Sequence, residues 1–294
     1  MTKIVNFSES DKSFILFPLS ALKTFITDAD GLNIILEYGI KRLGDSIPAD
    51  SITDEEMIEE SISEFRKGEY DGNLTGDLYD MIFDFYKKHK HLEIGLNDRC
   101  RNTFLKWYRI RLALEKLNLK GSIQVTIDKA QRINEKPGEP LIMASVDFIL
   151  KARNEVKPNE KQRMALALLF GLHSIIGMRR TWAATTQEMI KARMFGYLTP
   201  KREGKSYENK KTKDLWEKWT TRRRYESLIA WLQEMNLLKC YMGTTYRRTI
   251  VSVQCDWDTI KDDVTAFIIR HRKPSLQAKK QRDELSQMLN EQLK

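Results

Sequence analysis

Cysteine is scarce in this chain and shows no functional spacing. The three thiols lie far apart, fit no metal-ligand pattern and cannot all be paired in disulfides: Cys100, Cys240 and Cys255. Few and unpatterned cysteines are typical of proteins kept in a reducing compartment. We therefore expect neither a disulfide framework nor a metal site.

Long apolar runs are also missing. The longest, Met164–Leu172, continues to Ile176 only through Gly171, His173 and Ser174, and it is too short and too polar to cross a bilayer. The first residues, MTKIVNFSESDKSF, lack the charged start and apolar core of a secretory signal. These absences predict a cytoplasmic protein without a membrane partner.

The chain shows no clear motif for catalysis or for a cofactor. Thr199–Ser206 ends like a phosphate loop, but Thr199 replaces the first glycine and no buried strand precedes it. His173 stands in an apolar stretch, which is more typical of a core histidine with satisfied polar atoms than of a base. We expect no enzymatic activity, no cofactor and no small-molecule ligand.

Charge is distributed unevenly along the chain. Residues 1–150 hold 20 Lys and Arg against 25 Asp and Glu, whereas residues 151–294 hold 30 against 16. A cationic segment of this size favours binding to nucleic acid or to another anionic surface. The two halves are therefore expected to face different partners.

The overall pattern predicts a mainly α protein with a small β component. Pro158 and the polar residues around it mark a boundary between a helical, acidic N-terminal domain, 1–153, and a basic domain, 158–273. Residues 274–294 form an amphipathic pattern after Pro274, for which core docking, homodimerisation and fraying all stay open.

Periodicity predicts the individual elements of the N-terminal domain. Phe14–Phe17 is expected as a strand or an extended lead-in, and Ser122–Asp128 as a strand because Ile123, Val125 and Ile127 alternate. Spacing of three to four residues predicts helices over Leu19–Ile26, Leu32–Leu43, Thr53–Phe65, Leu74–His89, Arg99–Leu119 and Leu141–Arg153.

The most informative stretch is residues 220–253. Thr220 or Thr221 can cap a helix whose buried face would carry Tyr225, Leu228, Ile229, Leu232 and Met235. The opposite face would then carry Arg223, Ser227, Ala230 and Glu234. The start of this helix is therefore expected to be exposed and basic.

A hairpin is expected directly after this helix. Lys239–Met242 and Tyr246–Val253 are rich in strand-forming residues and flank a tip at Gly243–Thr245. Arginines at the helix start and at the hairpin turn would offer two cationic points to a phosphate backbone.

Residues 158–255 resemble the winged helix-turn-helix family at the level of the fold pattern. The first helix would be Asn159–Gly177, the short strand Trp182–Ala184, and the second helix Thr186–Phe195, with Thr185 and Glu188 at the spacing of a capping box. The family's short turn is replaced here by the 24-residue segment Gly196–Trp219. In an alternative register, Lys213–Trp219 is the second helix.

The resemblance implies binding of double-stranded DNA by a transcriptional regulator or a replication-initiator-like protein of a bacterial mobile element. We expect Arg223 and Ser227 to face base edges and Arg222 and Arg224 to hold phosphates, while the hairpin contributes Tyr246, Arg247 and Arg248. The basic segment Tyr197–Lys213, which includes Lys210 and Lys211, is expected to be mobile and to order on DNA. The alternative is a winged-helix protein–protein assembly module without nucleic-acid binding.

Overall fold

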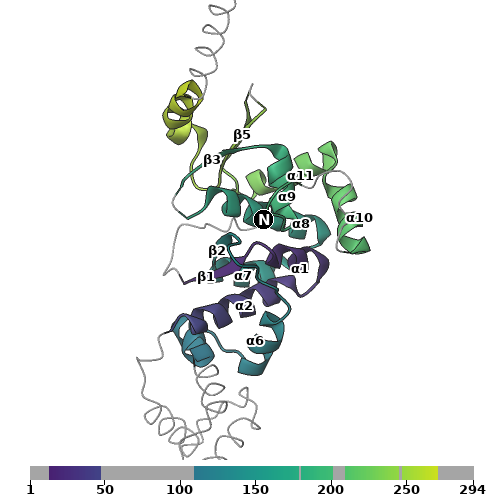
Figure 1. Ribbon diagram of the computed structural model, residues 1–294, viewed down its shortest axis with the longest axis vertical. Helices are drawn as coiled ribbons and strands as arrows, with labels where there is room; N and C mark the ends of the chain where they lie inside the picture. The colour runs from purple at the N-terminus through teal and green to yellow at the C-terminus, as the bar shows by residue number, and fades with distance from the viewer. Residues whose placement is uncertain (1–12, 48–108, 179, 201–208, 245–246, 271–294) are drawn as a thin grey trace, which may run out of the picture.

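The computed structural model describes residues 13–47, 109–178, 180–200, 209–244 and 247–270. This part of the chain is mainly helical and contains two small antiparallel sheets (Figure 1). The helices expected over Thr53–Phe65, Leu74–His89 and 274–294, together with Cys100, lie outside the described residues. The fold class predicted from periodicity is thus confirmed at this coarse level.

The first sheet joins segments far apart in the chain. Strand β1 (Phe14–Pro18) pairs antiparallel with β2 (Leu141–Ser145), so that Leu16 lies opposite Met143. Helices α1 (Ala21–Thr27) and α2 (Gly31–Asp45) follow β1. The strand at Phe14–Phe17 and both of these helices were predicted correctly.

The predicted helix Leu141–Arg153 is wrong for its first five residues. These form β2, and the chain then enters α7 (Val146–Lys151) and the π-helical turn η2 (Ala152–Val156). The five residues extend because β1 offers them a row of backbone donors and acceptors, a long-range partner that helical periodicity does not reveal.

The predicted strand Ser122–Asp128 is also wrong, because α6 (Ile123–Ala130) is a helix capped by Ser122. Thr126, Ile127 and Ala130 are buried on one face of α6, whereas Val125 is 41% exposed. The hydroxyl of Thr126 donates 2.7 Å to a carboxylate oxygen of Glu37 on α2. The alternating apolar residues therefore do not form one buried face.

Helix α8 (Glu160–Ile176) is the centre of the core. Asn159 and Gln162 exchange side-chain and backbone hydrogen bonds in a capping box, which fixes the start of α8. The ring of Phe170 meets that of Phe17 edge to face at 5.4 Å. Apolar side chains that precede and follow the predicted boundary around Pro158 in the sequence thus share one continuous core.

The second sheet belongs to the part of the chain after α8. Strand β3 (Ala183–Thr185) precedes α9 (Gln187–Met194), and the hairpin strands are β4 (Cys240–Gly243) and β5 (Thr249–Ser252). The sheet order is β3–β5–β4, and all pairs are antiparallel. Thr186, rather than Thr185, caps α9 by accepting a hydrogen bond from the Met189 amide.

Two helices lie between α9 and the hairpin in the sequence: α10 (Lys210–Trp219) and α11 (Arg222–Glu234). The expectation that Tyr197–Lys213 is mobile is wrong for its last four residues, which form the first turn of α10. Asn209 caps this turn by accepting 2.8 Å from the Thr212 amide, and Thr212 is buried. Residues 201–208 lie outside the described part of the chain.

A helix over residues 257–270 covers the outer face of the β3–β5–β4 sheet (Figure 1). The ring of Trp182, just before β3, meets that of Phe267 edge to face at 5.5 Å. A small core forms between the sheet and this helix from Cys240, Ile250, Ile260 and Val264. The neighbouring side chain on β5, Val251, belongs to the main core, as the two-residue period of a strand requires.

Candidate nucleic-acid interface

Helix α11 is held in one rotation by its buried face. Tyr225, Leu228, Ile229 and Leu232 are buried, as their spacing predicts. Thr221 precedes the helix, but its hydroxyl donates to the Lys218 carbonyl and accepts no hydrogen bond from the first turn of α11. The position of the helix start was therefore predicted correctly, whereas the capping bond was not.

The outward face of α11 combines one arginine with small and acidic residues. Arg223, Ala230 and Glu234 are exposed, and Ser227 is half-buried, with its hydroxyl donating 2.7 Å to the Arg224 carbonyl. This hydrogen bond uses the only proton of the Ser227 hydroxyl, although the oxygen can still accept a bond. Arg223 is thus the stronger candidate of the two for contact with a base edge.

The three consecutive arginines have different surroundings. The guanidinium of Arg222 pairs with the Glu226 carboxylate at 2.9 Å, and that of Arg224 lies 5.8 Å from the centre of the Trp219 ring. Arg223 makes no ion pair with any residue that the structure describes. Its charge is therefore available to an external anion.

The hairpin presents two further arginines. The Thr244 amide donates 2.7 Å to the Arg248 carbonyl, and Arg247 adopts a left-handed backbone with φ of 58°. Both arginines are exposed and make no ion pair within the described ranges. Tyr246 lies outside the described residues.

A buried tyrosine pair connects α11 to the hairpin. The hydroxyls of Tyr225 and Tyr241 lie 3.1 Å apart, and burial raises the pKa of both phenols, so both stay neutral. The ammonium of Lys191 on α9 lies 5.2 Å from the centre of the Tyr225 ring. Helix α9, helix α11 and strand β4 thus meet at one point, a convergence that sequence spacing did not reveal.

Lys210 and Lys211 begin α10, about one helix length (~15 Å) from the start of α11. The ammonium of Lys211 donates to the backbone carbonyl of Thr27 at the end of α1. The structure therefore ties Lys211 to the N-terminal part and does not bring it beside Arg223. The side chain of Lys210 is exposed.

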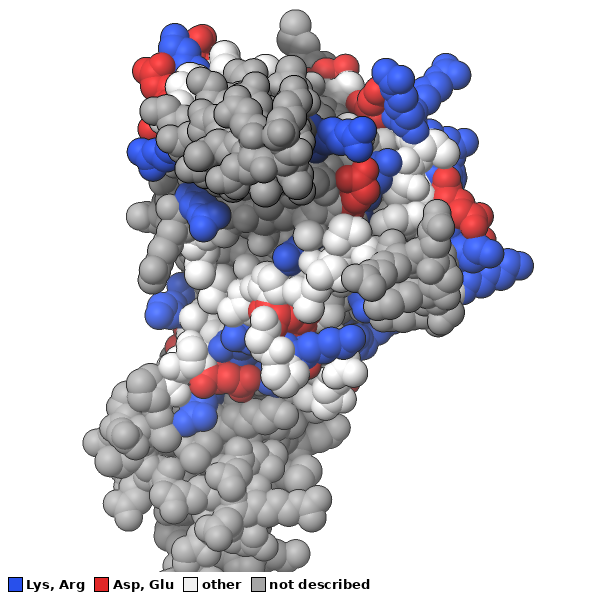
Figure 2. All heavy atoms as spheres, turned by 45° about the horizontal axis from the view of Figure 1, so that its top comes forward, with Lys and Arg blue, Asp and Glu red and all other residues white. Residues whose placement is uncertain are grey.

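The charge around the interface is mixed rather than uniformly positive. Figure 2 shows Lys and Arg side chains along the upper right edge of the molecule, interleaved with Asp and Glu. The sequence from 220 to 253 holds six basic and two acidic residues, so the local balance is still cationic. A local excess of positive charge favours the approach of an anion over that of a cation.

Metal clusters and membrane-spanning helices were also sought in the described part of the chain. It contains no group of three or more His, Cys, Asp or Glu side chains arranged to hold a metal ion. Among its helices, none combines the length and the apolar character needed to cross a bilayer. Comparison with protein-family models, curated proteins and solved structures finds no match for this chain.

Proposed function

We propose that residues 158–255 bind double-stranded DNA as a winged helix-turn-helix module, with α11 as the recognition helix and the β4–β5 hairpin as the wing. The observation that carries this proposal is the sheet order β3–β5–β4. A short strand between the first two helices pairs with the second strand of the hairpin, and α11 immediately precedes that hairpin. This arrangement supports the first helix as α8 and the second as α9.

In this proposal α10 is an addition to the winged-helix pattern and not its second helix. Helix α9 directly follows β3, packs closely on α8 at Gly171 and reaches α11 through Lys191 and Tyr225. Helix α10 instead contacts α1 and leads into α11. These contacts favour the register in which Thr186–Phe195 is the second helix.

The proposed docking places the outward face of α11 in the major groove. Arg223 can donate two hydrogen bonds to guanine O6 and N7, and the small side chain of Ala230 permits close approach. Arg247 and Arg248 contact the backbone or the minor groove from the wing. Arg222 and Arg224 bind phosphates, the first after giving up its pair with Glu226.

The biological setting rests on the family resemblance. A transcriptional regulator and a replication-initiator-like protein of a bacterial mobile element both use such modules, and both would place the protein in the cytoplasm. Homodimerisation through residues 274–294 stays a prediction.

The test is fluorescence anisotropy of a labelled 30-base-pair duplex titrated with the full chain at four salt concentrations. We expect the logarithm of affinity to fall linearly with the logarithm of salt, with a slope of about 0.9 per phosphate contact. The triple variant Arg223→Ala, Arg247→Asn, Arg248→Ala should bind more weakly and with a smaller slope. Asparagine is chosen at 247 because it tolerates the left-handed backbone there.

The matched control removes three exposed lysines elsewhere on the described surface: Lys116, Lys136 and Lys151. It lowers the net charge equally but leaves the proposed interface intact, so its salt slope should equal that of the wild type. A wild-type chain without salt-dependent affinity for the duplex would overturn the proposal and favour a protein–protein assembly module.

A further inference from the structure

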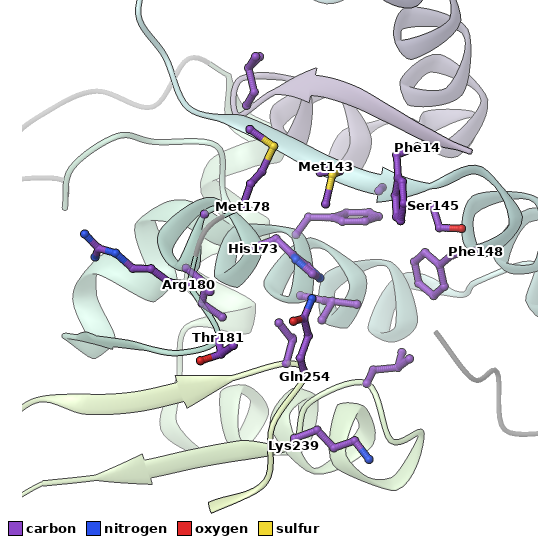
Figure 3. Close-up of a pocket in the computed structure, with 18 of the residues that line it drawn as sticks. Phe14, Met143, Ser145, Phe148, His173, Met178, Arg180, Thr181, Lys239 and Gln254 are labelled. Carbon is purple, nitrogen blue, oxygen red and sulfur yellow. The ribbon is translucent and has the colours of Figure 1, made fainter. Parts of the chain in front are cut away.

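A cavity of about 550 Å³ lies between the β1–β2 sheet, the C-terminal half of α8 and the base of the β4–β5 hairpin (Figure 3). Its size falls within the range of ~300–1,000 Å³ that is usual for small-molecule sites. The cavity is separate from the outward face of α11 and plays no part in the proposed DNA contacts.

Much of the cavity wall is apolar and includes aromatic side chains. Phe14, Met143 and Phe148 lie on its β1–β2 and α7 side, and Met178 follows α8. Phe14 and Met178 are 40% and 63% exposed, although both are large and apolar. Exposed apolar groups around a concave site favour an occupant with an apolar body.

Polar side chains project into the same space without protein partners. Figure 3 shows His173 and Gln254 approaching one another across the cavity. The His173 imidazole and the Gln254 amide make no side-chain hydrogen bond with any described residue. The expectation that His173 is a satisfied core histidine is therefore wrong, because its ring faces a cavity.

The rim carries positive charge. Arg180 and Lys239 line the cavity, and neither forms an ion pair within the described ranges. In Figure 3 the Arg180 side chain lies on one side of His173 and Lys239 lies beyond Gln254, and the charged end of each points away from these two side chains. Among the described residues that line the cavity, none is Asp or Glu. An anionic group in the cavity would thus meet no opposing carboxylate, and a change of rotamer would bring Arg180 and Lys239 towards it.

We propose that this cavity binds a small organic anion with an aromatic body, such as an aryl carboxylate. The aromatic body would contact Phe14, Phe148 and the two methionines. The carboxylate would accept hydrogen bonds from His173 or Gln254 and attract the flexible side chains of Arg180 and Lys239.

The site adjoins the anchors of both proposed DNA-contacting elements. Asn236 and Leu237 lie just after the C-cap of α11, Lys239 precedes β4, and Val253 and Gln254 follow β5, and all five line the cavity. A bound anion would therefore contact the base of the recognition helix and of the wing. Any effect of the anion on DNA affinity rests on the proposed function, whereas its binding does not.

The test uses 2-naphthoate as the probe and the full chain without DNA. Isothermal titration calorimetry should show saturable binding with one site per chain. The neutral analogue 2-naphthalenemethanol should bind about tenfold more weakly, because it lacks the charge-assisted hydrogen bonds. Lys239→Ala and Arg180→Ala should each weaken 2-naphthoate binding several-fold, whereas Lys151→Ala, on an exposed surface elsewhere, should not change it.

Two variants test whether the probe occupies this cavity. Ser145→Trp, in β2, and Met178→Trp, at the exposed rim, each place an indole in the cavity and should abolish binding. Circular dichroism and thermal unfolding identify a variant that fails to fold, and the rim variant keeps the test decisive in that case. Absence of saturable binding to the wild-type chain, or binding unchanged in folded Met178→Trp, would overturn the proposal.

A separate anisotropy titration adds saturating 2-naphthoate to the chain and duplex. A changed DNA affinity in the wild type, absent in Met178→Trp, would establish coupling between the two sites. If the chain binds 2-naphthoate but no DNA, the cavity proposal stands and the DNA proposal fails. The two failures are therefore distinguishable.

Discussion

The indole N–H of Trp219, the last residue of α10, donates a 2.7 Å hydrogen bond to the carboxylate of Glu160, the first residue of α8. The Lys218 ammonium lies 2.7 Å from the same carboxylate oxygen. Hydrogen bonds from Lys218 and Trp219 lower the pKa of Glu160, so its carboxylate stays ionised at neutral pH. This contact fixes the end of α10 where the chain turns into α11.

Trp219→Phe should destabilise the fold by about 1–3 kcal/mol, because it removes a hydrogen bond to a charged acceptor and some buried surface. Trp231→Phe is the matched control, since Trp231 is half-buried and its indole bonds no described residue. Urea unfolding measures both. Equal losses in the two variants would show that the contact with Glu160 contributes nothing beyond packing.

Arg223→Ala and Arg248→Ala should affect DNA binding differently. If Arg223 contacts a base, its loss should cost ~1–3 kcal/mol on duplexes carrying the preferred base and much less on duplexes altered at that position. Loss of Arg248, a phosphate contact, should weaken binding to all duplexes alike and reduce the salt slope by about one. Competition with a duplex library measures both effects, and a uniform loss for both variants would remove Arg223 from base recognition.

Gly171→Ala should destabilise the chain by about 1–3 kcal/mol. A Cβ atom at 171 would lie 2.8 Å from the Met194 amide nitrogen and 2.9 Å from the Arg193 carbonyl carbon, so α9 would have to move away from α8. Chemical denaturation of Gly243→Ala is the control, because no atom lies within 4 Å of a Cβ at that position. Unchanged stability in Gly171→Ala would mean that α9 shifts without cost.

His173 should make the stability of the chain fall in acid. Burial lowers its pKa from 6.5 to about 4, so the unfolded chain takes up a proton between these values that the folded chain refuses. The contribution of neutral His173 to the free energy of unfolding is therefore complete above pH 6.5 and is lost as the pH falls towards 4. In His173→Gln, the decrease in unfolding free energy over this range should be smaller by about 1–3 kcal/mol, measured by urea unfolding. An equal decrease in unfolding free energy in the wild type and in His173→Gln would contradict the lowered pKa of His173.

The chain's local patterns were sufficient to predict the proposed recognition helix and its buried face. Tyr225, Leu228, Ile229 and Leu232 repeat at helical spacing, and one continuous apolar face can be buried in only one rotation. The hairpin was equally evident, because two runs of strand-forming residues flank Gly243. In both cases neighbours in sequence are also neighbours in space.

The extended state of Leu141–Ser145 and the helical state of Ile123–Ala130 depended on contacts distant in sequence. The former has β1 as its partner, and the latter places Thr126 against Glu37 on α2. Short segments have weak intrinsic preferences, so their surroundings override their periodicity.

The cavity around His173 and the anchoring of α10 were decided by tertiary structure alone. The cavity wall combines residues from β1, β2, α8 and the base of the hairpin, and no local motif reports that these segments converge. Lys210 and Lys211 belong to a segment with few apolar residues. The helix that they begin is nevertheless fixed to the core, because Leu215 and Trp219 further along α10 are buried there. Sequence determined which faces had to be buried, and the long-range packing of those faces determined where polar groups were left facing open space.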